Sequence, residues 1–452
     1  MKKSLNAFLL IFILLFLTGC TVEGNKHQSP PPHENEKVQT NGSAQSEVTD
    51  YENEENEPMD SPSKRYVLNY PNIKAMWLSQ FDLQGVYVAD GRQRAEDDFT
   101  ERINDILEKI KQNGFNTVFL QIRPYADSFY PSEYYPTSRY VCGSYGDNLS
   151  YDPIEITVKA AHAAELSIHG WINPMRGMTT EEIKSVSNKY LIKKWYDEKA
   201  PFISELNGRL YLDPFYDETR GLIVDGIKEA LVKYKFDGIH MDDYFYPTTS
   251  ESFDKASYTA YKANGGTAPL KQFRYDNLNK LVSSIYSAVK EESPDLLFGI
   301  SPEGNMNNAT DKAFADVKTW CSKNGFVDYI CPRIYFGLEH QSWPFDKTAD
   351  KWASIIKNPE IKLIIGMTFG KALSKTDKWA GSGQNEWAEN TDVMKRCLEK
   401  TAENEKCAGV SVFCYQYYYD PVSGAEVEGT AVERKAFTIL LKELQWTKKS
   451  LD

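Results

Sequence analysis

Short runs of apolar residues recur along the chain from about residue 66 onwards, and each run ends at polar or turn-forming residues. Runs this short, with few polar positions inside them, are typical of strands that are buried on both faces. The sequence predicts eight such strands, at residues 74–82, 116–124, 167–174, 236–244, 296–305, 327–336, 362–369 and 409–416.

Stretches with a helical period of apolar residues lie between the predicted strands. Clear examples occupy residues 99–112, 153–165, 219–234 and 273–292. Apolar strands that alternate with amphipathic helices indicate a parallel sheet covered by helices, and eight repeats predict a closed (β/α)8, or TIM, barrel with loop insertions. An open doubly wound α/β sheet is the rival fold, but no G-x-G-x-x-G or phosphate-binding loop follows a strand. We therefore expect one domain over residues 66–452.

The N-terminus has the features of a lipoprotein signal peptide over residues 1–20. Two lysines precede an apolar run at residues 9–17, and small residues then lead to Cys20. The run is too short to span a bilayer easily, so we expect cleavage before Cys20 and lipidation of that cysteine, with palmitate among its acyl chains. An uncleaved anchor is the alternative. In both cases the domain is expected at the extracytoplasmic face of the bacterial cell membrane.

Residues 21–65 are predicted to form a disordered acidic tether. They contain almost no large apolar residue, and residues 21–60 carry ten acidic residues against two lysines. Such a segment cannot bury enough apolar surface to offset its ordering entropy. Residues 21–60 supply eight of the twelve net negative charges, so the folded domain is only mildly acidic. The sequence has no basic stripe of the kind that nucleic-acid backbones require, and we expect a monomer without a nucleic-acid partner.

Cysteine and histidine usage indicates neither a disulfide framework nor a metal site. Six cysteines follow Cys20 without a C-x-x-C pair, so most are expected in the core. The four histidines of the domain form no cluster of two histidines and a carboxylate by spacing, which argues against a metal-dependent deacetylase. These are His162, His169, His240 and His340. No cofactor or metal is expected.

Polar and aromatic residues gather where the predicted strands end. The ends read QIRP at 121–124, WINPMR at 171–176, HMDDY at 240–244, SPEGN at 301–305, PRIY at 332–335 and CYQY at 414–417. A single polar strand end is usually only capped by solvent. Six at the same end of a barrel indicate a polar, aromatic-lined mouth, where barrel enzymes carry their sites.

The strongest candidates for chemistry lie in the segment DGIHMDDY at residues 237–244. Because side chains alternate along a strand, Gly238, His240 and Asp242 share one face, which we place inside the barrel. Asp243 has the opposite parity but can reach the mouth where the strand ends. Two adjacent carboxylates repel each other and lie partly desolvated near aromatic residues, so one of them should have a raised pKa. A helix N-cap or a salt bridge is the alternative role for the pair.

Glu303, at the end of the next strand, is the third candidate catalytic residue. With Asp242 it could form the two-carboxylate pair of ordinary glycoside hydrolysis. Two roles remain open for His240: it is a core or orienting residue, or it is part of the site.

Several segments resemble those of a known family. They are residues 121–124 with Asp127 and Tyr130, residues 171–174 with Arg176, DGIHMDDYFYP at 237–247, FGISP at 298–302, and residues 328–332 followed by Tyr335. On these segments the chain resembles the bacterial glycosyl-hydrolase-like proteins grouped as the GHL10, or YngK-like, family. The match spans nearly the whole folded part.

The resemblance implies a (β/α)8 fold, export as a lipoprotein and, for some relatives, hydrolysis of peptidoglycan glycan strands stripped of their peptides. The chain departs from the family pattern at Glu303, where many relatives carry an apolar or small residue, and at Arg333, where glutamine is common. The first departure shifts the catalytic role towards Asp242 and Asp243. Such an aspartate pair is also similar to that of hexosaminidases in which the substrate's own N-acetyl group is the nucleophile, and peptidoglycan sugars carry that group.

The remaining candidates are residues that could bind a glycan. Aromatic rings can stack on sugar faces, and Arg123 and Arg176 could bind the lactyl carboxylate of muramic acid. Packing against loops, and salt bridges to Asp127 or Asp152, are the alternatives. The predicted binding residues are Arg123, Tyr125, Asp127, Trp171, Asn173, Arg176, His240, Tyr244, Tyr246, Asn305, Arg333, Tyr335, Tyr415 and Gln416. The rival function is a non-catalytic glycan-binding lipoprotein, which needs no carboxylate pair.

Overall fold

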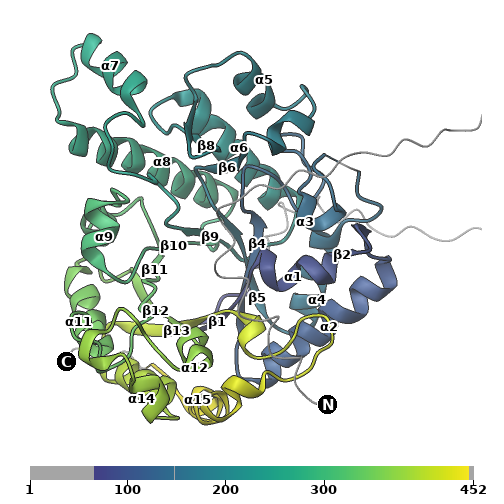
Figure 1. The fold of residues 1–452 in the computed structure, drawn as a ribbon, viewed down its shortest axis with the longest axis vertical. Helices are drawn as coiled ribbons and strands as arrows, with labels where there is room; N and C mark the ends of the chain where they lie inside the picture. The colour runs from purple at the N-terminus through teal and green to yellow at the C-terminus, as the bar shows by residue number, and fades with distance from the viewer. Residues whose placement is uncertain (1–65, 147, 447–452) are drawn as a thin grey trace, which may run out of the picture. The chain divides into compact units, whose positions relative to one another are not determined.

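Eight parallel strands close a barrel, as the sequence predicts. The computed structural model describes residues 66–146 and 148–446. Around the barrel the strands are β1 (Ile73–Leu78), β13 (Cys407–Phe413), β12 (Lys362–Thr368), β11 (Tyr329–Ile330), β10 (Leu297–Ser301), β9 (Gly238–Asp242), β5 (Ser167–Ile172) and β4 (Thr117–Arg123), and β4 pairs with β1 (Figure 1). Each overlaps one predicted strand, so the (β/α)8 barrel is confirmed. The predicted signal peptide, Cys20 and the tether lie outside the described residues.

Amphipathic helices form the outer layer. The four predicted helices are present as α2 (Glu96–Gln112), α4 (Pro153–Ala163), α6 (Asp217–Lys233) and α8 (Leu270–Glu292). In α2 the buried residues Phe99, Ile103, Ile106 and Ile110 recur at three or four positions, so one face packs on the barrel. The C-terminal part of the domain adds three further helices, α11 (Phe345–Ile355), α14 (Val393–Glu403) and α15 (Ala431–Glu443). Within the described ranges, no helix is long and apolar enough to cross a membrane.

Shorter elements connect these layers. The short helices are α1 (Gln80–Tyr87), α3 (Arg139–Cys142), α9 (Met306–Asp311), α10 (Val317–Trp320), α12 (Gly370–Ser374) and α13 (Glu386–Glu389), and a small hairpin is formed by β2 (Val88–Ala89) and β3 (Arg92–Gln93).

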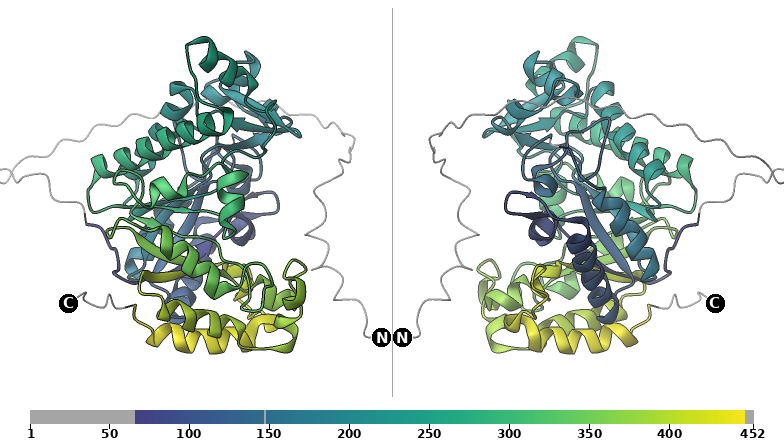
Figure 2. Two further views of the ribbon diagram at one scale, coloured as in Figure 1. Left: turned by 90° about the vertical axis from the view of Figure 1, so that its left-hand side faces the viewer. Right: turned by 90° about the vertical axis from the view of Figure 1, so that its right-hand side faces the viewer.

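Two insertions follow the C-terminal ends of β5 and β9. The first carries α5 (Leu191–Asp197) and a three-stranded antiparallel sheet in the order β6 (Arg176–Thr179), β8 (Arg209–Leu212), β7 (Ile203–Leu206). The second carries α7 (Lys255–Ala263). Figure 2 shows both insertions (teal) at one end of the domain and the last helices (yellow) at the opposite end.

A buried ion pair fastens the second insertion to the barrel layer. Arg274 of α8 donates to both carboxylate oxygens of Asp254, at 2.8 and 2.6 Å. It also donates to the carbonyl oxygens of Thr248 and Ser250, at 3.3 and 2.7 Å. The loop between β9 and α7 is therefore held by one side chain of α8.

Large aromatic side chains fill the inside of the barrel below the strand ends. The rings of Trp77 and Trp171 meet edge-on with centroids 4.7 Å apart, and His240 stacks on Phe119 at 4.1 Å. The Tyr329 hydroxyl lies 2.8 Å from Nδ1 of His240. Because these buried side chains occupy the interior, polar groups can meet a substrate only at an end of the barrel.

The two ends of the described domain meet at the N-terminal side of the barrel. The Trp446 N–H donates to Asn72 Oδ1 at 2.5 Å, and Asn72 Nδ2 donates to the Trp446 carbonyl oxygen at 3.3 Å. Asp237, which precedes β9, accepts the N–H groups of Leu68 and Ile168 at 2.6 and 2.8 Å. The first described segment is thus fixed to the end of the barrel opposite the one where β9 finishes.

Candidate active site

Asp242 is the last residue of β9 and shares its inward face with His240. It lies at the mouth of the barrel, which comprises the C-terminal strand ends and the residues that follow them. The side chain is buried, with 1 % exposure; Oδ1 accepts the Tyr244 N–H at 3.4 Å, and Oδ2 has no hydrogen-bond partner among the described residues. Burial raises the pKa of Asp242 to about 7, although the charge of Arg333 acts in the opposite direction. A carboxyl group that keeps its proton near neutral pH is a candidate general acid.

Asp243 lies next to Asp242 but has a different environment. Its carboxylate forms an ion pair with Arg333, which follows β11. The Arg333 N–H donates to the Pro302 carbonyl oxygen at 2.9 Å, and the Arg333 carbonyl accepts the Gly304 N–H at 3.1 Å. These two hydrogen bonds fix the backbone of Arg333, from which the guanidinium group extends to Asp243. One aspartate of the pair is balanced by a positive charge, and the other has a desolvated oxygen without a partner.

Trp171 and His240, two predicted binding residues, lie beneath the aspartates inside the barrel. The Trp77 ring contacts both, with centroids at 4.7 and 4.6 Å. In the described part of the chain, Trp171 Nε1 and His240 Nε2 have no hydrogen-bond partner. Burial lowers the pKa of His240 well below its usual value, so this histidine is neutral. They form a floor under Asp242 that contributes no charge.

Arg176 and Tyr244 form the wall of the mouth next to Asp242. The Arg176 guanidinium lies 4.5 Å from the centroid of the Tyr244 ring and 5.1 Å from that of Tyr125. Its positive charge also lowers the pKa of Asp242, to a smaller extent than burial raises it. Tyr244 is 42 % exposed, so its ring remains available to the apolar face of a sugar.

A row of buried amide groups lines another part of the mouth. The Gln80 N–H donates to Gln121 Oε1 at 2.9 Å, and Gln121 Nε2 donates to Asn173 Oδ1 at 3.3 Å. Gln80 Nε2 donates to the Tyr125 hydroxyl at 2.7 Å. Tyr125 and Asn173 are thus connected through Gln80 and Gln121, which are not among the predicted binding residues.

Tyr335 and Gln416 follow β11 and β13. The Tyr335 ring stacks on Phe413 at 6.1 Å, and its buried hydroxyl has no partner among the described residues. The Gln416 N–H donates to Asp82 Oδ1 at 2.7 Å, and its side chain turns to Cys414 Sγ at 3.3 Å. Tyr335 can therefore offer a hydroxyl to a ligand, whereas Gln416 is engaged with its own loop.

Glu303 and Asn305, predicted as a catalytic and a binding residue, are both hydrogen-bonded to the start of α9. The Glu303 backbone lies beside that of Arg333, but its carboxylate accepts a hydrogen bond from Asn308 Nδ2 of α9 at 2.5 Å. Asn305 is the N-cap of this helix, and its side chain accepts the N–H groups of Asn307 and Asn308 at 3.1 and 3.3 Å. Helix capping engages Asn305, and a side-chain hydrogen bond from Asn308 engages Glu303.

Arg123 and Asp127, also predicted to bind substrate, lie at or just beyond the end of β4, but their side chains contact other parts of the protein. The pairing of β4 with β5 shifts between Gln121 and Arg123, and beyond this bulge the Arg123 guanidinium lies 4.5 Å from the Tyr135 ring centroid, against α6. Asp127 is buried, its Oδ1 accepts the Tyr125 N–H at 2.8 Å, and burial raises the pKa of Asp127 to about 6. Arg123 therefore packs the end of β4 against α6, and Asp127 supports the loop that follows β4.

Tyr246 and Tyr415 point away from the aspartates as well. Tyr246 packs edge-on against Phe314 at 5.6 Å, with the Arg274 guanidinium 5.2 Å from its ring centroid. Tyr415 lies beside Tyr419 at 5.7 Å. Both follow a strand end, where alternation no longer predicts the direction of a side chain.

The described mouth offers carboxylates, guanidinium groups, amides and hydroxyls to a ligand. Within residues 66–146 and 148–446, no group of three or more histidine, cysteine, aspartate or glutamate side chains could hold a metal ion. The six cysteines in these ranges are all buried.

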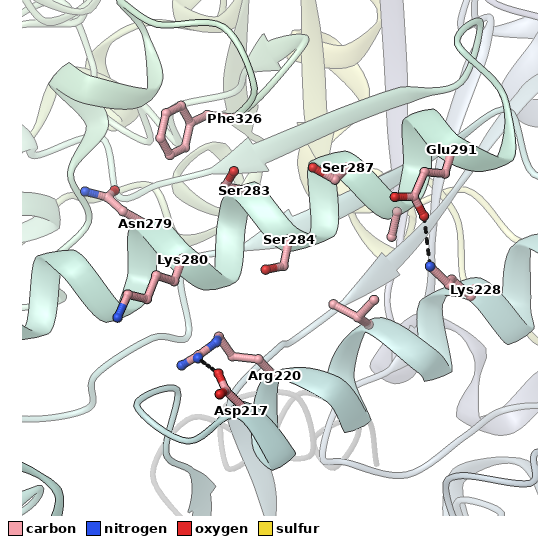
Figure 3. A pocket seen from close by; sticks show the side chains of 12 residues that line it. Asp217, Arg220, Lys228, Asn279, Lys280, Ser283, Ser284, Ser287, Glu291 and Phe326 are labelled. Atoms are coloured by element: carbon pink, nitrogen blue, oxygen red, sulfur yellow. Dashed lines mark hydrogen bonds and ion pairs between the residues drawn. The ribbon is translucent and has the colours of Figure 1, made fainter. Parts of the chain in front are cut away.

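A cavity of about 660 Å³ lies outside the barrel, between α6 and α8 (Figure 3). Its two carboxylates are already paired, since Glu291 binds Lys228 at 2.9 Å and Asp217 binds Arg220. Serines of α8 line the other side (Figure 3). Because both carboxylates are engaged and the cavity is remote from the strand ends, we do not place the active site there.

The chain is similar in sequence to proteins named glycosyl hydrolases. The family model described as Glycosyl hydrolase-like 10 matches residues 72–388. Glycosyl hydrolase YngK of Bacillus subtilis is 34% identical over 291 residues, which cover 60% of this chain and 56% of the relative. Glycosyl hydrolase DigH of Escherichia coli K12 is 29% identical over 287 residues, which cover 59% of this chain and 65% of the relative. The chain therefore matches less than two thirds of the length of either relative.

Solved structures share the fold at low sequence identity. The glycoside hydrolase domain of PgaB (BpsB) from Bordetella bronchiseptica has a TM-score of 0.50 at 12% identity and covers 81% of this chain and 99% of that domain. The catalytic domain of β-amylase from Paenibacillus polymyxa has a TM-score of 0.51 at 12% identity, covering 82% and 98%. At this identity the likeness supports the barrel and no detail of the site.

Proposed function

The chain belongs to the glycosyl hydrolase-like 10 family, and on this basis we propose that it is a glycoside hydrolase that cleaves a bacterial cell-wall polysaccharide. The substrate that we propose is peptidoglycan glycan strands without peptides, as the family resemblance implies. One observation carries the proposal: Asp242 is buried, with one carboxyl oxygen unpartnered among the described residues, and burial raises its pKa to about 7, while its neighbour Asp243 is ion-paired with Arg333. Two carboxyl groups with different charge states are what acid-catalysed glycoside cleavage requires.

In the proposed first step, Asp242 donates its proton to the glycosidic oxygen as the bond between that oxygen and C1 breaks. The carbonyl oxygen of the substrate's N-acetyl group attacks C1, and the positive charge of the resulting ring lies beside the Asp243 carboxylate. Water then attacks C1, Asp242 takes a proton from that water, and the acetamide is restored. We favour this substrate-assisted course over a direct two-carboxylate mechanism because Glu303 is hydrogen-bonded to Asn308.

We further propose that the enzyme works at the extracytoplasmic face of the cell membrane, anchored through lipid on Cys20. The order of basic, apolar and small residues before Cys20 supports this location. An acidic tether of the length of residues 21–65 would give the domain reach towards a cell-wall substrate.

Incubation of the purified protein with peptide-free glycan strands, intact peptidoglycan and chitin tests the proposal, with products identified by mass spectrometry. We expect soluble fragments from the peptide-free strands, and none from the Asp242→Asn variant at the same concentration. Binding of the strands without any product would indicate a non-catalytic glycan-binding protein. Equal product from the wild type and Asp242→Asn would remove Asp242 from the mechanism.

A further inference from the structure

Two arginines of the first insertion stand beside the mouth without a carboxylate partner. Arg176 opens β6 and Arg209 opens β8, and these strands pair in the small antiparallel sheet. The guanidinium of Arg209 lies 4.6 Å from the centroid of the Tyr125 ring, and that of Arg176 lies 5.1 Å from the same point. Arg209 Nη1 also donates to the carbonyl oxygen of Gly177 at 2.7 Å. Among the described residues, neither arginine takes part in an ion pair.

This arrangement differs from that of the arginines nearby. Arg139 also stacks on a tyrosine, Tyr140, at 4.6 Å, but it pairs with Glu182 at 3.0 Å. Two positive charges that share one aromatic ring repel each other unless an anion lies between or beside them. Among the described residues, the half-buried guanidinium groups of Arg176 and Arg209 therefore lack the anionic partner that Arg333 has in Asp243 and Arg139 has in Glu182.

The position of this pair relates it to the reaction. The Arg176 guanidinium lies over the exposed ring of Tyr244, and the backbone N–H of Tyr244 binds Asp242. A sugar that stacks on Tyr244 with its glycosidic oxygen near Asp242 would direct a substituent towards Arg176 and Arg209. Guanidinium groups held against aromatic rings are pre-oriented, and carboxylates are the anions that they bind through two hydrogen bonds.

We propose that Arg176 and Arg209 bind a carboxylate carried by a sugar next to the scissile bond, and that they restrict the enzyme to acidic glycans. This rests on the proposed function, because it assumes that the mouth holds a glycan. Two kinds of sugar supply such a carboxylate: muramic acid, on a lactyl ether, and uronic acids, on the ring itself. The shared feature is the carboxylate, and the test separates the two sources.

The first measurement compares kcat/KM for peptide-free glycan strands with kcat/KM for the same strands after their carboxylates are converted to methylamides. We expect the wild type to prefer the native strands by about 10- to 100-fold, the range of one charge-assisted bidentate contact. Arg209→Gln should bring this ratio close to one, and Arg209→Lys, which keeps the charge but loses the planar fork, should keep part of it. Arg139→Gln is the matched control and should keep the full preference. A preference that survives in Arg209→Gln, or a wild type without any preference, would overturn the proposal.

The second measurement does not depend on turnover. The Asp242→Asn protein, alone and combined with Arg209→Gln, is titrated with a muramic acid disaccharide, a hyaluronan tetrasaccharide and an N-acetylglucosamine oligomer. Tighter binding of a carboxylated ligand than of the neutral oligomer, lost with Arg209→Gln, supports the proposal, and the better of the two acidic ligands identifies the source of the carboxylate. Equal binding of all three overturns it. If the wild type cleaves no glycan, the proposed function fails, but this titration still decides the role of the arginine pair.

Discussion

The protonation of one buried carboxyl group sets the pH dependence that we expect. Because burial raises the pKa of Asp242 to about 7, the protonated fraction falls as the pH rises through 7. If Asp242 is the general acid, kcat/KM should decrease about tenfold per pH unit above that value. Arg333→Gln removes a charge that lowers this pKa, so the descending limb should move to higher pH. A limb that stays in place, or activity that increases above pH 7, would contradict the assignment.

Asp242→Asn should separate activity from stability. Loss of the acid should lower kcat/KM by roughly 10²- to 10⁴-fold. The pKa of Asp242 is higher in the folded protein than its ordinary value of 3.8, so the folded state holds the proton more tightly and the wild type loses stability as the pH rises from about 4 to about 7. Asparagine has no charge to desolvate. We expect the variant to be more stable than the wild type at pH 8, by about 1 kcal/mol or more.

Urea unfolding at pH 5 and pH 8 checks the stability part of this expectation, because the difference between variant and wild type should grow with pH. A variant that is less stable at both values would show that Asp242 stabilises the fold instead.

Glu303 and Asp243 provide a second comparison between residues. Since the Glu303 carboxylate is bound to Asn308, Glu303→Gln should change kcat/KM by less than about threefold, whereas Asp243→Asn should lower it by roughly 10²-fold or more through loss of charge stabilisation. Kinetics on peptide-free strands measure both. If Glu303→Gln is as damaging as Asp242→Asn, the direct two-carboxylate mechanism replaces the substrate-assisted one.

The sequence predicts the side chains of a strand well and those beyond its end poorly. Alternation along β9 correctly pairs His240 with Asp242 on one face, because the strand is regular there. It fails for Arg123, since a bulge in β4 leaves no mark in the sequence. Alternation along the strands also does not identify Arg209. This residue belongs to an insertion, and only its contact with the Tyr125 ring shows that it lies beside the mouth.

The sequence predicts the strands and helices of the fold better than it predicts the positions of individual side chains. Apolar runs identify all eight strands and four helices because burial on both faces leaves a continuous apolar signature. The predicted strand at 327–336 is observed only as Tyr329–Ile330. Pro332, just beyond it, has no N–H to donate, and the chain continues by isolated bridges such as Arg333 with Gly366. Loop insertions were predicted in general, but the position of the one after β5 was not, since its short strands have no long apolar run.

The helix α8 offers a test of what fastens the second insertion. Asp254→Ala leaves the buried guanidinium of Arg274 without its carboxylate, and we expect a loss of about 3–5 kcal/mol in the free energy of unfolding. The exposed pair of Lys271, on the same helix, with Asp311 is the control, and Asp311→Ala should cost less than about 1 kcal/mol. Denaturant unfolding compares the two variants. Equal costs would mean that the insertion does not depend on the buried pair.

On the scale of the whole molecule, the domain should be independent of the preceding segment. The described residues belong to one compact unit, and the sequence of residues 21–65 offers little apolar surface for a core. We expect a protein that lacks residues 21–65 to unfold cooperatively with an unchanged midpoint and to keep its activity on soluble fragments. Thermal unfolding and kinetics on short glycans measure this, and a broad or lowered transition would show that the segment supports the fold.

The hydrogen bonds between Asn72 and Trp446 have a consequence for the order in which the elements can follow one another along the chain. A chain can in principle enter a closed barrel at any strand, and here the two ends of the described domain are already neighbours. A short peptide between these ends would permit a circular permutant whose new termini lie at Gly265, an exposed loop residue between α7 and α8. The ribosome would then deliver α8 first and β9 among the last strands, yet every strand would keep the same two partners. The order of synthesis is thus separable from the architecture that brings Asp242 and Asp243 to the mouth.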